Sequence, residues 1–416
     1  MIVSIIGLGY IGLPTAAVLA SKDIKVVGVD VSQHVVDTIN QGKIHIIEPG
    51  LDALVREAVQ KNHLKAVINP EKADVFMIAV PTPFKGNHEP DLSYIRLAAK
   101  AIAPMLEKGN LVILESTSPV GTTEKMMTWM REERLDLSFP EFGNNNFIAD
   151  IAVAHCPERV LPGQVVRELI ENDRIIGGVT DYCAKQAKDL YKIFVDADCL
   201  LTDCRTAELS KLVENSFRDV NIAFANELSL ICDKLGINVW KLIELANHHP
   251  RVNILQPGPG VGGHCIAVDP WFIVDSSPDE AKLIRTARLV NDNKPNFVLG
   301  KIDKAVKAIG KNKSDLKIAC LGLSFKPDID DLRESPALSI AGKIGLMGFS
   351  ELFLVEPNIS SIPDKLKGES ISITSADKAI KAADIVVLLV DHTPFKKMDL
   401  EVLSGKQIVD TRGIWS

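Results

Sequence analysis

The chain lacks the features that mark several common classes of protein. Its 416 residues contain no low-complexity tract and no apolar stretch long enough to cross a bilayer. They also show no excess of basic side chains, because 47 Lys and Arg stand against 54 Asp and Glu, a formal net charge of −7. An acidic chain is a poor candidate for binding nucleic acid or an anionic membrane surface. We therefore expect neither partner, and the length predicts two or three domains of ordinary size.

A cysteine framework is also missing. Seven cysteines are scattered along the chain, and no two form a CxxC pair. An odd number of dispersed cysteines argues against a disulfide scaffold or a zinc knuckle and favours a reducing compartment, which we expect to be the cytoplasm. The opening segment, MIVSIIGLGYIG, is short, interrupted by glycine and without a basic leader. We expect it to form a buried strand and not a signal peptide.

Strand-like and helical segments alternate in both halves of the chain. The strand-like segments are 1–7, 26–30, 74–83 and 110–123 in the first half and 317–323, 351–357, 384–391 and 407–413 in the second. This alternation predicts parallel, doubly wound sheets. Between the halves, residues 206–235 contain neither Pro nor Gly and repeat apolar residues at helical spacing, which predicts one long helix or two closely joined. The fold class we expect is therefore α/β, with two Rossmann-like doubly wound domains joined by a central helical dimerisation region.

A dinucleotide-binding pattern follows the first predicted strand. The residues of this turn are Gly7, Gly9, Tyr10, Ile11 and Gly12, and they form a GxGxxG motif. The glycines allow a tight turn and close approach of a pyrophosphate, and the following helix supplies N–H groups at its positive end. Asp30, at the end of the second strand, would bind ribose hydroxyls and disfavour a 2′-phosphate, so we expect NAD and not NADP. The alternative is a glycine-rich turn that binds no dinucleotide.

Polar side chains end two further strands of the first half. Thr82 follows one strand, and Ser116 and Thr117 follow another. Ligands of parallel sheets bind beyond the carboxyl ends of the strands, so these residues are candidates for a ligand site.

Cys265 ends the glycine-rich segment PGPGVGGHC, and Asp269 follows four residues later. The glycines let the backbone fold around a phosphorylated ligand and leave the thiol uncrowded. We expect Cys265 to be a nucleophile activated by a positive neighbour or a base. Most cysteines are small buried hydrophobes, and we expect this of the cysteines at 156, 183, 199, 204, 232 and 320. His264 is adjacent to Cys265, but neighbouring side chains usually point apart, so we do not expect a Cys–His pair.

Two other groups of polar residues leave alternatives open. Lys211, Asn215 and Arg218 stand at i, i+4 and i+7 of the predicted long helix. They could donate to an oxyanion and to a substrate, or form a solvated stripe, and spacing alone favours neither. His248, His249 and His264 match no standard ligand spacing, so we expect no metal site.

Together these motifs resemble the UDP-glucose/GDP-mannose dehydrogenase family from end to end. The matching segments are GLGYIGLP (7–14), VPTP (80–83), STSPVGTT (116–123), CPERVLPG (156–163), ELSKLVENSFRDVNIAFANEL (208–228), GPGVGGHC (258–265) and GLSFKPDIDDLRESPA (322–337). The resemblance implies an NAD-binding domain over 1–200, a helical dimerisation region over 201–300 and a UDP-sugar-binding α/β domain over 301–416. It also implies a homodimer.

The resemblance also implies roles for single residues. Cys265 falls on the family nucleophile, Lys211 and Asn215 on its oxyanion donors, and Asp269 on its acid/base aspartate. Thr82 and Thr117 match positions near NAD and the catalytic water. Further implied substrate-binding residues are Arg159, Val160, Arg218, Arg251, Gly262, Lys326, Arg333 and Arg412, and Arg251 would reach the substrate of a partner subunit.

One position departs from the family pattern. The glucose enzymes carry a second glutamate four residues after the one matching Glu158, and here that position is Pro162. A base role therefore passes to Glu158 or to a water held by Thr117 and Asp269. The change fits a pocket for an N-acetylated sugar. The segment 249–273 resembles the branch that acts on UDP-linked N-acetylmannosamine for bacterial surface polysaccharides, including enterobacterial common antigen.

The expected reaction is a four-electron oxidation of a sugar 6-hydroxyl to a carboxylate, with two NAD per sugar and a cysteine thioester. UDP-N-acetylglucosamine and UDP-glucose are the alternative substrates. A second possibility is a two-electron β-hydroxyacid-type dehydrogenase in which Lys211 is the acid/base and Cys265 is structural. A third is a non-catalytic NAD-sensing regulator, against which the full Cys, Lys, Asn and Asp set argues.

Overall fold

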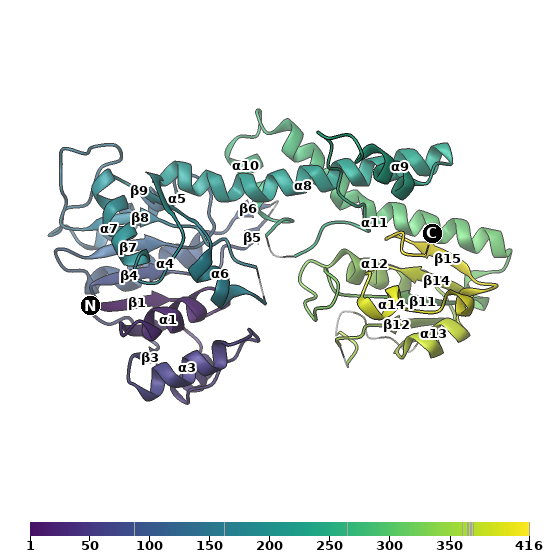
Figure 1. Ribbon diagram of the computed structural model, residues 1–416, viewed down its shortest axis with the longest axis horizontal. Helices are drawn as coiled ribbons and strands as arrows, with labels where there is room; N and C mark the ends of the chain where they lie inside the picture. The colour runs from purple at the N-terminus through teal and green to yellow at the C-terminus, as the bar shows by residue number, and fades with distance from the viewer. Residues whose placement is uncertain are drawn as a thin grey trace. The chain divides into compact units, whose positions relative to one another are not determined.

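Two compact units make up the chain, Met1–Glu214 and Asn215–Ser416, the first built on a mostly parallel sheet and the second on a fully parallel one (Figure 1). The computed structural model describes residues 1–86, 88–161, 163–263, 265–359, 361–363, 366, 368 and 370–415. None of the helices in this described part of the chain has the length and apolar character needed to cross a membrane. The predicted α/β class with two doubly wound domains and a helical centre is confirmed.

The first unit contains an eight-stranded sheet in the order β10-β9-β8-β7-β4-β1-β2-β3. Its strands are β1 (Ile2–Ile6), β2 (Lys25–Val29), β3 (Leu64–Val67), β4 (Val75–Ile78), β7 (Leu111–Leu114), β8 (Ala152–His155), β9 (Arg174–Gly178) and β10 (Cys199–Asp203). Neighbouring strands are parallel except β8 and β9. The strand order reverses at β1, between β2 and β4, which is the switch point where such sheets bind dinucleotides.

Helices cover both faces of this sheet and bury its strands between them. One face packs against α1 (Gly12–Ser21), α2 (Gln33–Asn40), α3 (Leu51–Gln60), α6 (Val165–Glu171) and α7 (Asp181–Tyr191). The other packs against α4 (Ser93–Ile102) and α5 (Thr122–Glu133). A short hairpin, β5 (Phe84–Lys85) and β6 (Glu89–Pro90), lies outside the sheet. The near-continuous apolar strands follow from burial on both faces.

The predicted central helix is one element, α8 (Cys204–Leu235), 32 residues long. The boundary between the two units falls inside it, after Glu214. The absence of Pro and Gly explains why the helix is not interrupted.

The second unit contains a five-stranded, fully parallel sheet in the order β13-β12-β11-β14-β15. Its strands are β11 (Lys317–Leu321), β12 (Glu351–Val355), β13 (Ile371–Ile373), β14 (Ile385–Leu388) and β15 (Gln407–Asp410). One face packs against α11 (Lys282–Ile309) and α12 (Pro336–Gly345), and the other against α13 (Ala376–Ala382) and α14 (Thr393–Lys396). The unit also contains α9 (Val239–Ala246) and α10 (Asp269–Ser276).

The two sheets repeat the same turn after their first strands. Gly7 and Gly322 follow β1 and β11 with φ of +94° and +90°, a conformation that favours glycine. In each turn the N–H of the next residue donates to a carboxylate that ends the adjacent strand, Asp30 at 3.0 Å or Glu356 at 2.7 Å. The repeat of architecture that the sequence indicated therefore extends to backbone hydrogen bonds.

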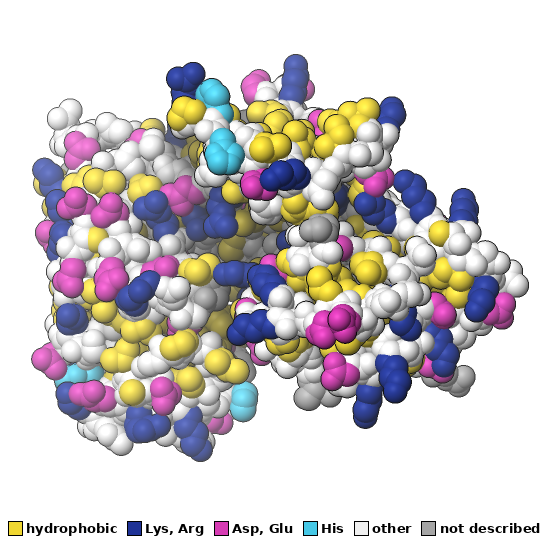
Figure 2. Space-filling model, turned by 45° about the vertical axis from the view of Figure 1, so that its right-hand side comes forward, with side chains coloured by type: hydrophobic (Ala, Val, Ile, Leu, Met, Phe, Trp, Pro, Cys, Tyr) yellow, Lys and Arg dark blue, Asp and Glu magenta, His cyan; other side chains and the backbone are white. Residues whose placement is uncertain are grey.

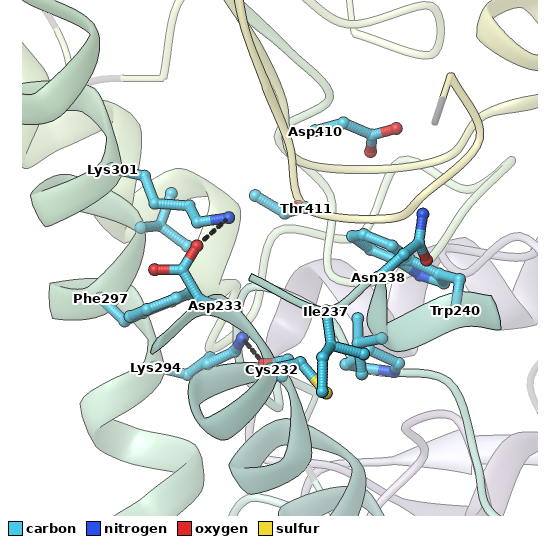
Figure 3. A pocket seen from close by; sticks show the side chains of 14 residues that line it. Cys232, Asp233, Ile237, Asn238, Trp240, Lys294, Phe297, Lys301, Asp410 and Thr411 are labelled. Atoms are coloured by element: carbon cyan, nitrogen blue, oxygen red, sulfur yellow. Dashed lines mark hydrogen bonds and ion pairs between the residues drawn. The ribbon is translucent and has the colours of Figure 1, made fainter. Parts of the chain in front are cut away.

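A cavity of about 100 Å³ lies in the second unit between α8, α9, α11 and the end of β15 (Figure 3). Lys294 of α11 faces it and is 5% exposed. Its ammonium donates to Ser229 Oγ at 2.5 Å and stands 4.7 Å from the centre of the Phe297 ring. Burial lowers the pKa of Lys294 to about 7, the positive charge of Lys301 adds to the decrease, and the carboxylate of Asp233 opposes it.

Lys294→Met should remove a pH-dependent penalty on stability. The unfolded state binds more protons than the folded state between pH 7 and 10.5, so the penalty from Lys294 is full below pH 7 and fades as the pH rises. The Tm difference between the variant and the wild type should therefore be more favourable to the variant at pH 7 than at pH 9.5. Lys304→Met, an exposed change on the same helix, is the control. An equal difference at both pH values would show that Lys294 is not perturbed.

Candidate active site

The dinucleotide turn has the geometry that a pyrophosphate needs. A Cβ at Gly12 would stand 1.8 Å from the carbonyl oxygen of Gly7, so this close helix–strand contact requires glycine. A Cβ at Gly9 would meet nothing within 4 Å, which leaves an open approach to the turn. The N-cap residue of α1, Ile11, makes no side-chain capping hydrogen bond. An open turn at this helix N-terminus fits the phosphates of NAD, and Asp30 lies beside it.

The next two strand ends are tied together. Thr82, which follows β4, donates its hydroxyl to the carbonyl oxygen of Thr117 at 2.6 Å. Ser116 donates to the carbonyl oxygen of Val80 at 2.6 Å. The structure thus brings the predicted residues Thr82 and Thr117 together at one edge of the sheet.

Glu158 has both carboxylate oxygens engaged. One accepts from Arg174 at 2.7 Å, and the other accepts from the backbone N–H of Arg159 at 2.6 Å. Glu158 and Arg174 are 6% and 1% exposed. Both oxygens of this buried carboxylate are therefore already hydrogen-bonded within the protein. Arg159 itself pairs with Glu214 at 2.8 Å, and Val160 next to it is half-buried against the core.

More titratable groups are buried behind Glu158. Burial raises the pKa of Glu115 to about 7, and the charge of Glu158 adds to this, although Tyr191 donates to Glu115 at 2.7 Å. Burial also lowers the pKa of His155 to about 3 and raises that of Cys156 to about 12. The Cys156 thiol therefore stays protonated, in agreement with its predicted packing role.

The glycine-rich loop 258–263 before Cys265, called the nucleophile loop after the predicted role of that cysteine, rests on backbone and ring atoms of the segment 325–336. A Cβ at Gly262 would stand 2.6 Å from the carbonyl oxygen of Glu334, and one at Gly263 would stand 3.0 Å from the Phe325 ring. The N–H of Gly263 donates to the carbonyl oxygen of Arg333 at 3.2 Å. Glycine is therefore required here for close approach.

Cys265 emerges from this loop with an exposed side chain, whereas the other six cysteines are buried. Its carbonyl oxygen accepts the N–H of Asp269 at 2.8 Å, at the start of α10. The buried carboxylate of Asp269 accepts from the Asn215 amide at 2.5 Å. Three predicted site residues thus come together in the second unit.

Lys211, Asn215 and Arg218 share one face of α8, as their spacing predicts. Lys211 is half-buried, Asn215 is buried and Arg218 is exposed. At about 100° per residue, this face lies roughly opposite a stripe of exposed apolar side chains on the same helix. The members of the stripe are Leu209, Val213, Phe217, Phe224, Ile231 and Leu235.

The remaining predicted substrate residues lie in the second unit. Arg251 is exposed after α9, and Lys326 is exposed after β11. Arg333 forms a bidentate pair with Asp331, with its closer contact at 2.7 Å. Arg412 lies beside the nucleophile loop, because its guanidinium is 2.7 Å from where a Cβ at Gly258 would stand. Pro162 and His264 lie outside the described residues.

Several supporting residues were not predicted from the sequence. Glu208 of α8 accepts from the N–H groups of Gly121 and Thr123 at 2.6 and 2.7 Å, so it caps α5 behind the Thr117 loop. Glu48 accepts from Gly163 and Val165 and holds the loop that follows Glu158. The only sign of these roles in the sequence was the position of Glu208 and Glu48 among mostly apolar neighbours. Their hydrogen-bond partners lie 85 or more residues away and could not be identified.

His392 anchors the loop that carries Lys326. It is fully buried, contacts Glu356 at 3.0 Å and accepts the N–H of Asp328 at 2.9 Å. Asp328 has a φ of +62° and binds Thr393 in turn. Among the described residues, no group of three or more His, Cys, Asp or Glu side chains is placed to hold a metal ion.

The fold and the dinucleotide turn define an NAD-binding dehydrogenase with a second nucleotide-binding α/β domain. The domains of the UDP-glucose/GDP-mannose dehydrogenase family match the chain in order: the NAD binding domain at 1–195, the central domain at 205–293 and the UDP binding domain at 319–416. The chain belongs to this family, and it is an NAD-dependent oxidoreductase of UDP-sugars.

Several relatives cover the whole chain. It is 64% identical over 408 residues, 98% of each chain, to the UDP-N-acetyl-D-mannosamine dehydrogenase of Campylobacter jejuni. It is 59% identical to the NDP-N-acetyl-D-galactosaminuronic acid dehydrogenase of Ralstonia nicotianae, over 100% of this chain and 96% of the relative. Among solved structures, the UDP-D-ManNAc dehydrogenase of Pyrococcus horikoshii matches with a TM-score of 0.89 and 40% identity, covering 100% and 96% of the two chains.

Proposed function

We propose that this protein oxidises UDP-N-acetyl-D-mannosamine to UDP-N-acetyl-D-mannosaminuronate, with two NAD per sugar and Cys265 as covalent nucleophile. The observation that carries the mechanism is the arrangement of Cys265, Asp269 and Asn215. Cys265 has an exposed side chain, its carbonyl oxygen accepts the Asp269 N–H, and the buried carboxylate of Asp269 accepts from the Asn215 amide. This set is suited to addition at a carbonyl carbon and to stabilisation of the oxyanion that results.

In the proposed reaction the protein binds NAD and the UDP-sugar, orients the reacting groups and transfers protons. The turn 7–12 and Asp30 would hold NAD, which accepts a hydride in each of the two oxidations. The first oxidation converts the sugar CH₂OH to an aldehyde and releases a proton. The Cys265 thiolate then forms a C–S bond to the aldehyde carbon, and Lys211 and Asn215 donate to the oxygen. The second oxidation removes the remaining hydrogen on that carbon and leaves a thioester.

Hydrolysis of the thioester completes the reaction. Water adds to the carbonyl carbon, the C–S bond breaks, the thiol is restored and a carboxylate leaves. We assign activation of this water to Thr117 and Asp269, because both oxygens of Glu158 are already bound to Arg174 and to the Arg159 N–H. Glu158 then holds the 158–161 loop in place through its hydrogen bond from the Arg159 N–H. We propose that Arg159 and Val160 of this loop bind substrate.

The proposed UDP-sugar contacts come from several elements. We assign Arg218, Arg251, Gly262, Lys326, Arg333 and Arg412 to the sugar nucleotide. Cationic side chains around a glycine-rich loop are suited to a diphosphate. The functional parts we propose are 1–200 for NAD, 201–300 for dimerisation and 301–416 for the UDP-sugar. A reducing cytoplasm suits an enzyme with one exposed thiol and six buried ones.

The identity of the sugar rests on the relatives. The proposal of N-acetylmannosamine as the sugar is supported by the 64% identity to the Campylobacter jejuni enzyme. An N-acetylgalactosamine-type sugar is a second candidate, because the Ralstonia relative is named for that acid at 59% identity. For the mannosamine sugar, the product would serve bacterial surface polysaccharide synthesis of the enterobacterial common antigen type.

We also propose a homodimer formed through α8. Phe217 and Phe224 are 69% and 54% exposed, and with the rest of the apolar stripe they extend along most of the helix. Exposed hydrophobic side chains gather at the top of Figure 2, the level at which Figure 1 draws α8, α9 and α10. A contiguous apolar face of this kind supports a subunit interface.

A panel of UDP-sugars tests the substrate. The kcat/KM for UDP-N-acetylmannosamine should exceed that for UDP-N-acetylglucosamine, UDP-N-acetylgalactosamine and UDP-glucose by about tenfold or more, since epimers change hydrogen bonds at the site. NADH formation gives the rate, and complete conversion should yield two NADH per sugar. A higher kcat/KM for another sugar would reassign the substrate, and one NADH per sugar would indicate the two-electron reaction.

Cys265→Ser should bind NAD and UDP-sugar almost as well as wild type and lose turnover by about 10³-fold or more, because a hydroxyl is a far weaker nucleophile at neutral pH. Steady-state NADH formation measures this loss, and intact mass should reveal a slowly hydrolysed ester. Changing each buried cysteine to alanine is the control and should leave most of the activity. Near-normal turnover of Cys265→Ser would rule out the covalent mechanism.

Phe217→Asp combined with Phe224→Asp should dissociate the dimer, because a buried carboxylate at an apolar interface is costly. Sedimentation should show a monomer with strongly reduced activity if Arg251 completes the partner's site. Leu346→Asp, which changes an exposed leucine outside α8, is the control and should remain dimeric. A fully active wild-type monomer would disprove the assembly.

A further inference from the structure

A chain of buried polar side chains leads from α11 and α8 to the nucleophile loop. Asp219, Asn226 and Asn291 are fully buried, and Arg288 is 1% exposed. Asp219 Oδ1 accepts from Arg288 at 2.6 Å and from the Asn291 amide at 2.8 Å. Asn291 then accepts from the Asn226 amide at 2.8 Å, and Asn226 accepts the N–H of Gly258 at 2.9 Å.

The partners fix the direction of every bond in this chain. Asn291 faces two acceptors, the Asp219 carboxylate and the Asp219 carbonyl oxygen, so its NH₂ group must point to Asp219. The side-chain oxygen of Asn291 therefore faces Asn226, and the Asn226 NH₂ group must donate to it. The oxygen of Asn226 is left for the backbone N–H of Gly258, a group that can only donate. The acceptors at Asp219 and the donor at Gly258 therefore require the same donor-to-acceptor direction along this series of hydrogen bonds.

A helix irregularity adds to the placement of Asn291. Pro295 lies inside α11 and has no N–H to offer the carbonyl oxygen four residues earlier, which belongs to Asn291. That oxygen faces the loop, 3.5 Å from where a Cβ at Gly260 would stand. Asn291 thus meets the nucleophile loop with its backbone while its side chain continues the hydrogen-bond chain.

The loop needs such support because its glycines offer no side chains to anchor it. Its far end is tied by the hydrogen bond from Gly263 to Arg333, and its near end by the one from Gly258 to Asn226. We propose that Asp219, Asn291 and Asn226 form a directional relay that positions Gly258 and, through the loop, the Cys265 thiol. The three are positioning residues, and their effect on turnover rests on the proposed role of Cys265.

Asn226→Asp tests the relay with almost no change of shape. The new carboxylate still accepts from Gly258, but it cannot donate to Asn291 and places two acceptors face to face. The kcat should fall more than tenfold, while the KM for NAD stays within twofold of wild type. Alkylation of Cys265 by iodoacetamide, measured without substrate by peptide mass, should change in rate by at least threefold.

Asn110→Asp is the matched control. Asn110 is also a buried amide that accepts a backbone N–H, from Glu107 at 2.7 Å, and donates to a carbonyl, that of Ala73 at 3.0 Å. It lies in the first unit, at the strand end away from the dinucleotide turn. Its variant should lower Tm about as much as Asn226→Asp and leave both the kcat and the alkylation rate near wild type.

A second variant covers the case in which Asn226→Asp does not fold. Asp219→Asn keeps the volume but replaces the charged acceptor at the start of the relay by a neutral amide, which leaves only the backbone carbonyl oxygen as a fixed acceptor for Asn291. Reversal of both amides then becomes easier and would deprive Gly258 of its partner. Asp219→Asn should lower the kcat and change the alkylation rate of Cys265, as Asn226→Asp does. Deuterium exchange in peptides covering 254–263 should also be faster.

The proposal is overturned if the kcat of Asn226→Asp stays within threefold of Asn110→Asp, or if the kcat falls while alkylation of Cys265 is unchanged. Failure of the covalent mechanism gives a different result. In that case Cys265→Ser keeps its turnover, and alkylation still reports whether the relay positions the loop.

Discussion

Close backbone packing beneath the nucleophile loop is the constraint on which the second unit depends. The loop approaches the 325–336 segment so closely that a Cβ at Gly262 would collide with a carbonyl oxygen. Removing side chains from the loop leaves the Cys265 thiol uncovered, but it also removes the usual means of fixing a loop. Backbone hydrogen bonds to Asn226 and to the Arg333 carbonyl take over that task.

The helix α8 combines tasks that other proteins divide among several elements. Its first turns cap α5 through Glu208, and one face carries Lys211 and Asn215. The opposite face is apolar and exposed. Deeper in the helix, Asp219 and Asn226 begin the relay to the loop. A helix can do this because its residues turn by a constant angle, so neighbours in sequence serve different surroundings.

Buried charges in both units hold loops in place. Arg174 with Glu158 and Arg288 with Asp219 are ion pairs almost entirely removed from water. The desolvation of such pairs offsets much of their attraction, so they are weak sources of net stability. Breaking one would leave a charge without compensation. Their value is in fixing orientation, which explains why they lie behind the loops that carry the candidate site residues.

The sequence by itself determined the features that arise from local pattern. These are the strand–glycine turn–helix at 1–21 with Asp30, the continuous helix α8, and four strands of each sheet, because periodicity and glycine placement act over a few residues. The strands β3, β8, β9, β10 and β13 were not predicted from the sequence. It also showed the family through its motifs. Only the tertiary structure decided that β9 runs antiparallel to β8, that α11 continues through Pro295, and that Glu158 is committed to Arg174. The pairings of Glu208 with Thr123 and of Asn226 with Asn291 join residues 85 and 65 positions apart. Such contacts depend on how distant segments pack, and no local pattern in one sequence encodes them.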